Sequence, residues 1–360
     1  MCIRDSLYID VVEEGLTVAI SSPTSENPFI EFGSDLTIIA QANNAENLSV
    51  YIDNVEVATT ANQEISYTHS IEQYGKQWVK AIATSSDNVA MDSVYIYVPG
   101  NNTVANLPEG LTPGVNITGS NEVTLVLHDP PAHKNFVFVI GDFNDWEIDD
   151  NYQMNRTFDR THFWITISNI DPSQEYIYQY WIDGEIKIAD PYTEKISDPW
   201  HDHWISDTNY PDLIEYPEGK TTGIASVLQI QQDEYEWEST NFTPPAKGDL
   251  VIYELHIRDF DEDDYIVSVM ERLDYLETLG VNAIELMPIN EFEGNDSWGY
   301  NPSFYFATDK AYGTKNDYKK FIDECHKRGI AVIIDMVLNH SFGQSPIVQM
   351  YFDENAGEWG

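Results

Sequence analysis

The sequence has few cysteines, few basic residues and no long apolar run. Its two cysteines, Cys2 and Cys325, are too far apart and too few to form a disulfide framework or a zinc-ligand pattern. Lysine and arginine total 18 against 61 acidic residues, a formal net charge of −43. Nucleic-acid binding needs a basic surface, so this charge excludes nucleic acid as a partner and disfavours anionic membranes. Without about 18 consecutive apolar residues, insertion into a membrane by a spanning helix is also excluded.

What is present predicts a folded chain with several domains. Hydrophobic residues make up 42% of the 360 positions, and that length predicts roughly two or three domains. Behind a tail at 1–15, short runs of alternating apolar and polar residues predict an immunoglobulin-like β-sandwich over 16–100. A second strand-rich block predicts another β-sandwich over 101–215, and the polar, acidic stretch 216–248 reads as a linker with one strand near Ser226–Ile230.

The periodicity changes after residue 248. Apolar runs then alternate with residues spaced three and four apart, which predicts a βα repeat with a parallel sheet over 249–360. The expected strands are Val251–Ile257, Ala283–Met287 and Ile330–Leu338, and the expected helices are Tyr265–Leu279 and Asn316–Arg328.

Candidate functional residues follow the second and third of these strands, because functional groups gather at the carboxyl ends of parallel strands. Trp298-Gly299-Tyr300 offers aromatic rings that could stack on a sugar, although aromatic residues pack in cores more often. Asp335, Asn339 and His340 place three polar groups at the end of an apolar strand. Taken alone, such a polar strand end is equally compatible with a purely structural role.

The combination of motifs resembles the start of the catalytic barrel of the α-amylase family, glycoside hydrolase family 13. The matching segments are Tyr253–His256, Trp298–Pro302 with Tyr312-Gly313, and Asp335–His340. The resemblance implies a fold of two N-terminal β-sandwiches followed by the first three strands of a (β/α)8 TIM barrel.

The resemblance also implies roles for single residues. Tyr300 matches the family's tyrosine that stacks under the sugar next to the scissile bond, and His340 matches the histidine that hydrogen-bonds the same sugar. Asp335 matches an aspartate that organises the active-site arginine and the nucleophile. Asn339 matches a residue that ligates calcium in many members, which makes calcium the one cofactor implied.

The upstream block resembles the early-set or carbohydrate-binding type of β-sandwich that precedes the barrel in isoamylases and branching enzymes. Gly141–Trp146, Tyr180–Gly184 and Asp190–Tyr192 carry this likeness. Trp146 is then a candidate for sugar stacking, but a sandwich that only packs on the barrel is the favoured interpretation.

The resemblance implies a retaining glycoside hydrolase that acts on α-1,4-glucans such as starch, glycogen and maltodextrins. The family's nucleophile, acid/base and third acid are expected beyond Gly360, so no catalytic residue is assigned here and the chain is expected to be an inactive N-terminal fragment. A branching or debranching enzyme of the same family and a non-catalytic glucan-binding protein are the alternatives. The expected partner is a neutral α-glucan, and an extracytoplasmic location is expected by analogy.

Overall fold

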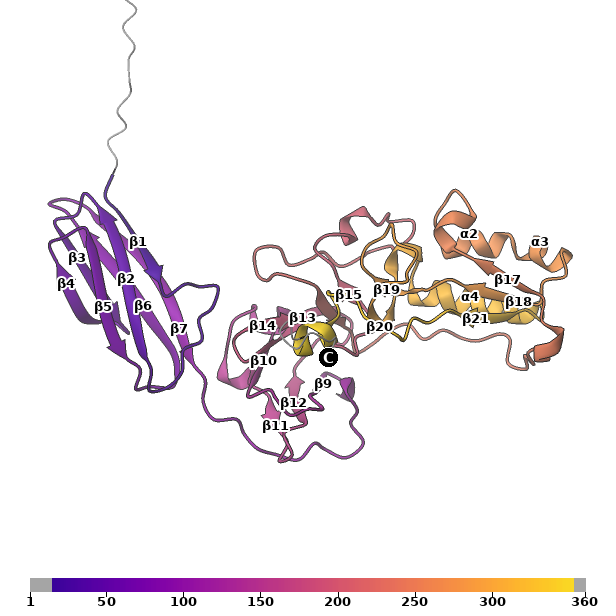
Figure 1. Cartoon of the computed structure of the whole chain (residues 1–360), viewed down its shortest axis with the longest axis horizontal. Coiled ribbons are helices and arrows are strands. Elements are labelled where there is room, and N and C mark those ends of the chain that lie inside the picture. Colours follow the sequence, from indigo (N-terminus) through magenta and orange to yellow (C-terminus); the bar gives the residue numbers. More distant parts are fainter. Residues whose placement is uncertain (1–14, 353–360) are drawn as a thin grey trace, which may run out of the picture. The chain divides into compact units, whose positions relative to one another are not determined.

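The computed structural model describes residues 15–352, and the chain divides into two compact units, Met1–Asn101 and Asn102–Gly360 (Figure 1). Each unit is described by itself. Among residues 15–352, no helix is both long enough and apolar enough to span a membrane.

The first unit contains two antiparallel sheets with strand orders β1-β2-β5 and β4-β3-β6-β7. Both sheets contribute fully buried residues to one core, among them Ile38 of β2, Leu48 of β3 and Val79 of β6. The strands are β1 (Thr17–Ser22), β2 (Asp35–Asn43), β3 (Asn47–Ile52), β4 (Val55–Thr60), β5 (Glu64–Ser70), β6 (Gly75–Thr84) and β7 (Val89–Val98).

The turn between β3 and β4 shows why the sequence folds this way locally. Asp53 and Asn54 both have positive φ, 46° and 68°. Two-residue hairpin turns need this left-handed backbone, and aspartate and asparagine tolerate it better than most side chains.

The second unit begins with two more sheets, which again share one core. Their orders are β10-β13-β16-β15, with β14 paired to β13, and β11-β12-β9-β8. Leu125 and Phe163 from one sheet pack with Val139 and Tyr180 from the other. The strands are β8 (Gly114–Gly119), β9 (Glu122–His128), β10 (Val137–Gly141), β11 (Asn155–Arg156), β12 (His162–Ser168), β13 (Tyr176–Ile182), β14 (Ile186–Ile188), β15 (Ile196–Ser197) and β16 (Ala225–Leu228).

The C-terminal part of this unit contains a parallel sheet of order β17-β18-β21, with an antiparallel hairpin, β19–β20, inserted after β18. Its strands are β17 (Ile252–Leu255), β18 (Ala283–Leu286), β19 (Asn290–Phe292), β20 (Pro302–Thr308) and β21 (Ala331–Ile334). Its helices are α1 (Ile257–Phe260), α2 (Ile266–Glu271), α3 (Leu273–Thr278), α4 (Lys315–Lys327) and α5 (Pro346–Tyr351).

Two expected elements differ from those observed. The helix expected over Tyr265–Leu279 is divided into α2 and α3 at Arg272, where φ is −100° and ψ is 0°. The strand expected over Ile330–Leu338 ends at Ile334, because Asp335 makes the last ladder bond, from its N–H to the carbonyl of Leu286 at 3.0 Å. The apolar residues after Asp335 therefore belong to an irregular segment.

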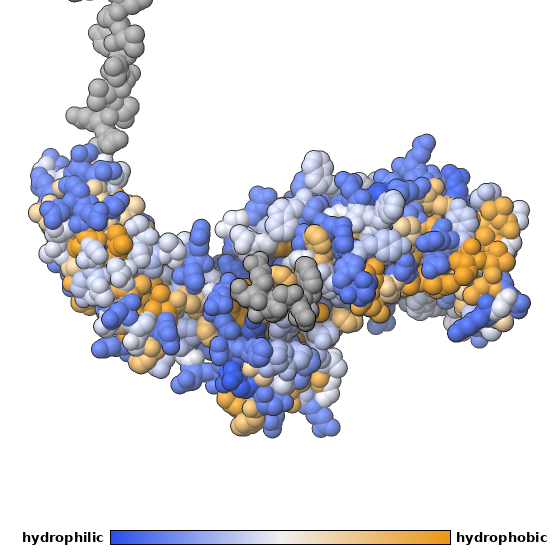
Figure 2. Space-filling view, in the orientation of Figure 1, coloured by the Kyte–Doolittle hydropathy of each residue, from blue (hydrophilic) through white to orange (hydrophobic). Residues whose placement is uncertain are grey.

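Helices α2, α3 and α4 bury apolar residues against this sheet, including Val269, Leu276 and Phe321 around Ile284. The outer strands remain partly uncovered, because Ile252 of β17 and Ile334 of β21 are exposed. Leu338, in the irregular segment after β21, is exposed as well. Figure 2 shows apolar residues gathered over the β17–β18–α3 end of this part. Parallel sheets are normally covered on both faces, so this exposure is unusual for the sheet type.

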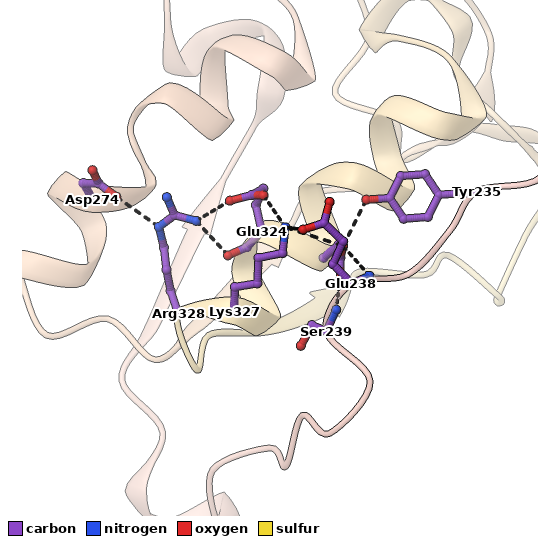
Figure 3. Close-up of polar contacts among 8 residues, drawn as sticks. Tyr235, Glu238, Ser239, Asp274, Glu324, Lys327 and Arg328 are labelled. Carbon is purple, nitrogen blue, oxygen red and sulfur yellow. Dashed lines mark hydrogen bonds and ion pairs between the residues drawn. The ribbon is translucent and has the colours of Figure 1, made fainter.

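The region interpreted from sequence as a linker contributes to the fold. It contains β16, and its segment 235–239 is bound to helix α4 through Asp323. Figure 3 shows Tyr235, Glu238 and Ser239 of this segment beside the helix. The Asp323 carboxylate accepts hydrogen bonds from the Tyr235 hydroxyl at 3.1 Å and from the backbone N–H groups of Glu238 and Ser239 at 3.0 and 2.8 Å. One carboxylate of helix α4 therefore holds three donors of this segment.

Ion pairs and one ring contact extend this attachment. The Lys327 ammonium lies 2.8 Å from the Glu238 carboxylate, and the Phe242 ring stacks on His326 with 3.9 Å between ring centroids. Arg328 pairs with Asp274 of α3 at 3.0 Å, as Figure 3 also shows. One turn of α4 thus joins the connecting segment to the neighbouring helix.

We predict that Asp323→Asn lowers the free energy of unfolding by about 1–3 kcal/mol, because an amide cannot accept from all three donors and leaves a partly buried N–H unpaired. Burial raises the pKa of Asp323, but its hydrogen-bond donors outweigh burial and hold that pKa below the ordinary value. The wild-type stabilisation is therefore present above the ordinary aspartate range and is lost as pH falls through the lower folded pKa.

Urea unfolding of both proteins between neutral and acid pH measures this difference. Asp274→Asn is the matched control, because Asp274 forms an exposed pair with Arg328 whose loss should cost less than about 1 kcal/mol. Equal losses in the two variants would contradict the prediction.

Candidate functional site

The β19–β20 hairpin carries the first candidate residues, in its connecting loop 293–301. Gly299 has φ of +87°, and a Cβ at this position would lie 2.6 Å from the carbonyl oxygen of Pro288. Both the positive φ and the close backbone require glycine here. The turn at Gly299 in turn sets the position of Tyr300.

Tyr300 and Asp335 meet at the carboxyl end of the parallel sheet. The Tyr300 hydroxyl donates a hydrogen bond to Asp335 Oδ2 at 2.9 Å, and 37% of the tyrosine remains exposed. Burial and the Asp335 carboxylate, with weaker contributions from Glu254 and Glu285, raise the pKa of Tyr300 to about 12. The phenol therefore stays protonated at neutral pH and is the hydrogen-bond donor to Asp335.

His340 belongs to the same group of residues. Its Nε2 lies 3.3 Å from Asn301 Oδ1, and the Asn301 amide nitrogen donates to Glu293 Oε1 at 2.8 Å. Because the Asn301 oxygen can only accept, Nε2 is the protonated nitrogen in this contact. The Tyr305 hydroxyl donates to the carbonyl of His340 at 2.8 Å and holds the loop after β21 in place. The structure thus brings Tyr300, Asp335 and His340 to one edge of the sheet.

Asn339 lies beside His340 in the lining of an adjacent cavity, with its side chain exposed. Within residues 15–352, no group of three or more His, Cys, Asp or Glu side chains could hold a metal ion. A calcium site needs about six to eight oxygen ligands. Among the described residues, Asn339 is not part of a cluster of carboxylates that could supply them. Calcium stays a prediction from the resemblance, and no step below depends on it.

Trp146 does not join the other candidates. It is only 6% exposed, and its indole N–H donates to Asp142 Oδ1 at 2.9 Å. Asp142 also accepts from the backbone N–H of Ile177 at 2.7 Å, so the tryptophan helps to tie η1 (Asp142–Asn144) to β13. A ring buried in this way has no face to offer a sugar, and the sugar-stacking role considered for Trp146 is wrong.

Comparison with known proteins identifies a family for the C-terminal part of the second unit. Residues 261–356 match the family model "Alpha amylase, catalytic domain". This part of the chain belongs to the α-amylase family. The family resemblance inferred from the sequence motifs is thereby confirmed.

Individual relatives are enzymes whose names refer to malto-oligosyltrehalose or to 1,4-α-glucan. The malto-oligosyltrehalose trehalohydrolase of Saccharolobus solfataricus is 33% identical over 189 residues, which cover 52% of this chain and 29% of that protein. The 1,4-alpha-glucan branching enzyme GlgB of Oceanobacillus iheyensis is 27% identical over 262 residues, which cover 70% of this chain and 38% of that protein. The chain therefore spans well under half the length of these curated relatives.

A solved structure also resembles this chain in its fold. The putative α-amylase from Salmonella typhimurium aligns with a TM-score of 0.51 and 23% identity over 66% of this chain and 35% of that chain. At this level of identity the likeness concerns the fold alone.

The structure also contains a buried ion cluster that the sequence did not predict. The Lys310 ammonium, on η5 (Lys310–Tyr312), is 3% exposed and lies 2.6 Å from Glu291 Oε1 and 3.1 Å from Asp202 Oδ1. Glu291 belongs to β19, whereas Asp202 begins η3 (Asp202–Trp204), between β15 and β16. No spacing rule relates residues 202, 291 and 310, so only the folded chain reveals the cluster.

The cluster is held together by charge. Burial opposes the positive charge of Lys310, but Glu291, Asp202 and Asp309 outweigh burial and raise the lysine pKa above its ordinary value. Lys310 therefore stays protonated at physiological pH. It joins the loop 198–205, between β15 and β16, to the hairpin that carries Tyr300.

We predict that Lys310→Met destabilises the protein by about 3–5 kcal/mol, because it removes the ammonium that pairs with the buried carboxylates of Glu291 and Asp202. Chemical unfolding of the 360-residue chain measures the change. Lys315→Met is the matched control, since Lys315 pairs with Glu194 at the surface and its loss should cost about 1 kcal/mol or less. A Lys310→Met chain as stable as this control would contradict the prediction.

Proposed function

We propose that this chain provides the first sugar-binding residues of an α-amylase-type retaining glycoside hydrolase that acts on α-1,4-glucans. The observation that carries the proposal is the contact between the Tyr300 hydroxyl and Asp335 at 2.9 Å, made beside His340 at the carboxyl end of β21. Family members use residues at these positions around the sugar next to the scissile bond. The relatives' names, which include a 1,4-alpha-glucan enzyme, support an α-glucan substrate.

The geometry suits a pyranose ring. A sugar has an apolar ring face with hydroxyl groups at its rim, and an aromatic ring matches the face while polar side chains match the rim. The Tyr300 ring is partly exposed, and its hydroxyl is held by Asp335. His340 and Asn301 supply hydrogen-bonding groups alongside it. These groups bind and orient a sugar without any net positive charge.

The proposal includes the architecture of two β-sandwiches followed by the first strands of a (β/α)8 barrel. The parallel order β17-β18-β21 and the helices on one side of this sheet support it. The exposed apolar residues Ile252 and Ile334 on the outer strands support it as well, because neighbouring barrel strands would cover them.

The retaining mechanism needs two carboxylates about 5 to 5.5 Å apart, one as nucleophile and one as acid/base. Asp335 is engaged by Tyr300, and Glu291 is engaged by Lys310. The family pattern assigns the catalytic acids to strands four and five and to the segment after strand seven. None of the residues in this chain is proposed as nucleophile or acid/base.

We predict that the 360-residue chain by itself releases no reducing sugar from soluble starch. A reducing-end assay with a mock purification as the control tests this, with binding of starch in an affinity gel as evidence that the chain is folded. Release of reducing ends above the mock level would show that catalytic carboxylates lie among these residues.

Sugar binding itself is tested at Tyr300. We predict that Tyr300→Ala weakens maltoheptaose binding by the full 360-residue chain about tenfold, or roughly 1.4 kcal/mol, because the stacking ring is lost. Tyr300→Phe keeps the ring and loses only the bond to Asp335, so it should weaken binding less. Titration calorimetry measures the dissociation constants.

Tyr275→Ala is the matched control for this series, since Tyr275 is an exposed tyrosine on α3. Its affinity for maltoheptaose should equal that of the wild type. A Tyr300→Ala chain that binds as tightly as Tyr275→Ala would rule out Tyr300 as a sugar-stacking residue.

A branching enzyme is the second candidate, because the alignment with a GlgB covers 70% of this chain. The protein that carries these residues, assayed on amylose, separates the two reactions. Hydrolysis raises the number of reducing ends, whereas branching creates α-1,6 linkages with no such rise. The purely glucan-binding alternative loses its main support, because it depended on Trp146 and that side chain is buried.

A further inference from the structure

A cavity of about 650 Å³ lies beside the loop that carries Tyr300. His201 and Trp204 from the sandwich part line one side of it, and residues 293–297 of the hairpin loop line the other. Neither the sequence motifs nor the family roles described above include this cavity.

Trp204 gives the cavity an aromatic wall. Its side chain is 75% exposed, the largest exposure among the exposed tryptophans of the described residues, and the His203 ring lies 4.6 Å from it. A large aromatic side chain left in water at the rim of a concave polar site is typical of a binding surface. An indole ring presents a flat apolar face of the kind that packs on a sugar ring.

The loop that carries Trp204 is anchored on several sides. His201 Nδ1 lies 2.9 Å from Asp198 Oδ2, and the amide of Asn295 donates to the His201 carbonyl at 3.2 Å. A Cβ on Gly294 would lie 2.9 Å from the His201 ring, so the two loops are in close contact. Beneath them, Asp202 is bound to the buried Lys310. The loop is therefore held in place before any ligand binds, which lowers the entropic cost of binding.

Glu293 connects this cavity with the candidate site. Its Oε1 accepts hydrogen bonds from Ser297 at 2.9 Å and from Asn301 at 2.8 Å, and Asn301 contacts His340. Its Oε2 is buried and finds no hydrogen-bond partner within residues 15–352. A buried acceptor without a donor is unfavourable. Glu293 both lines the cavity and holds Asn301, the residue that contacts His340.

The surrounding charge restricts the class of ligand. Glu293 and Asp296 line the cavity, while Asp198 and Asp202 lie in the supporting loop. Carboxylates on both sides disfavour anionic ligands such as phosphates. Neutral hydroxyl-rich ligands, in contrast, match a tryptophan beside carboxylate and amide groups.

We propose that Trp204 and residues 293–297 form an additional subsite for an α-glucan, which binds a part of the glucan chain that extends beyond the sugar at Tyr300. This inference rests on the proposed function. It adds that a loop of the β-sandwich part determines how tightly longer glucans bind.

Chain length of the ligand separates this subsite from the Tyr300 site. Dissociation constants of the full 360-residue chain are measured for maltotriose and maltoheptaose by titration calorimetry. The wild type should bind maltoheptaose about tenfold more tightly than maltotriose. Trp204→Ala should abolish this difference and leave maltotriose binding unchanged, whereas Trp204→Phe should keep part of it.

Tyr300→Ala should weaken the binding of both ligands. Trp78→Ala, which removes an exposed tryptophan of the first unit, should leave the binding of both unchanged. A Trp204→Ala chain that keeps the wild-type preference for maltoheptaose would overturn the subsite while leaving the proposed function in place. A wild-type chain that binds neither ligand would overturn the proposed function and the subsite together.

Discussion

The buried ion cluster around Lys310 is the constraint on which the arrangement of the site depends. A lysine removed from water is costly unless carboxylates surround it, and here Glu291 and Asp202 contact its ammonium directly. Those two carboxylates come from different parts of the second unit. The requirement to neutralise one buried cation therefore fixes the loop 198–205 against the hairpin that carries Tyr300.

The hairpin and the parallel sheet together position Tyr300 and Asp335. Gly299 permits the turn that precedes Tyr300, while the last ladder bond of β21 positions Asp335. Side chains that are 35 residues apart in sequence thus meet through one hydrogen bond. The net charge of −43 does not oppose the proposed binding of a glucan, because an acidic surface does not repel a neutral ligand.

Prediction from sequence was accurate where the signal is local. Helix α4 was expected over Asn316–Arg328 and occupies Lys315–Lys327, because apolar spacing, the Thr314–Asp317 capping box and Gly329 all mark it. Prediction was less accurate where tertiary contacts compete with local preference. The apolar run after Asp335 resembles a strand, yet it leaves the sheet, and the acidic segment 235–239 resembles a free linker, yet Asp323 binds it.

The sequence by itself determined the class of the C-terminal part, its βα repeat, its family resemblance and the residue types at Tyr300, Asp335 and His340, because these depend on periodicity and on short motifs. Only the tertiary structure decided that Trp146 is buried and that Trp204 is exposed. It also decided that Lys310 joins residues 108 and 19 positions away in sequence. Burial and ion pairing depend on which distant segments meet, and no local pattern in the sequence specifies that meeting.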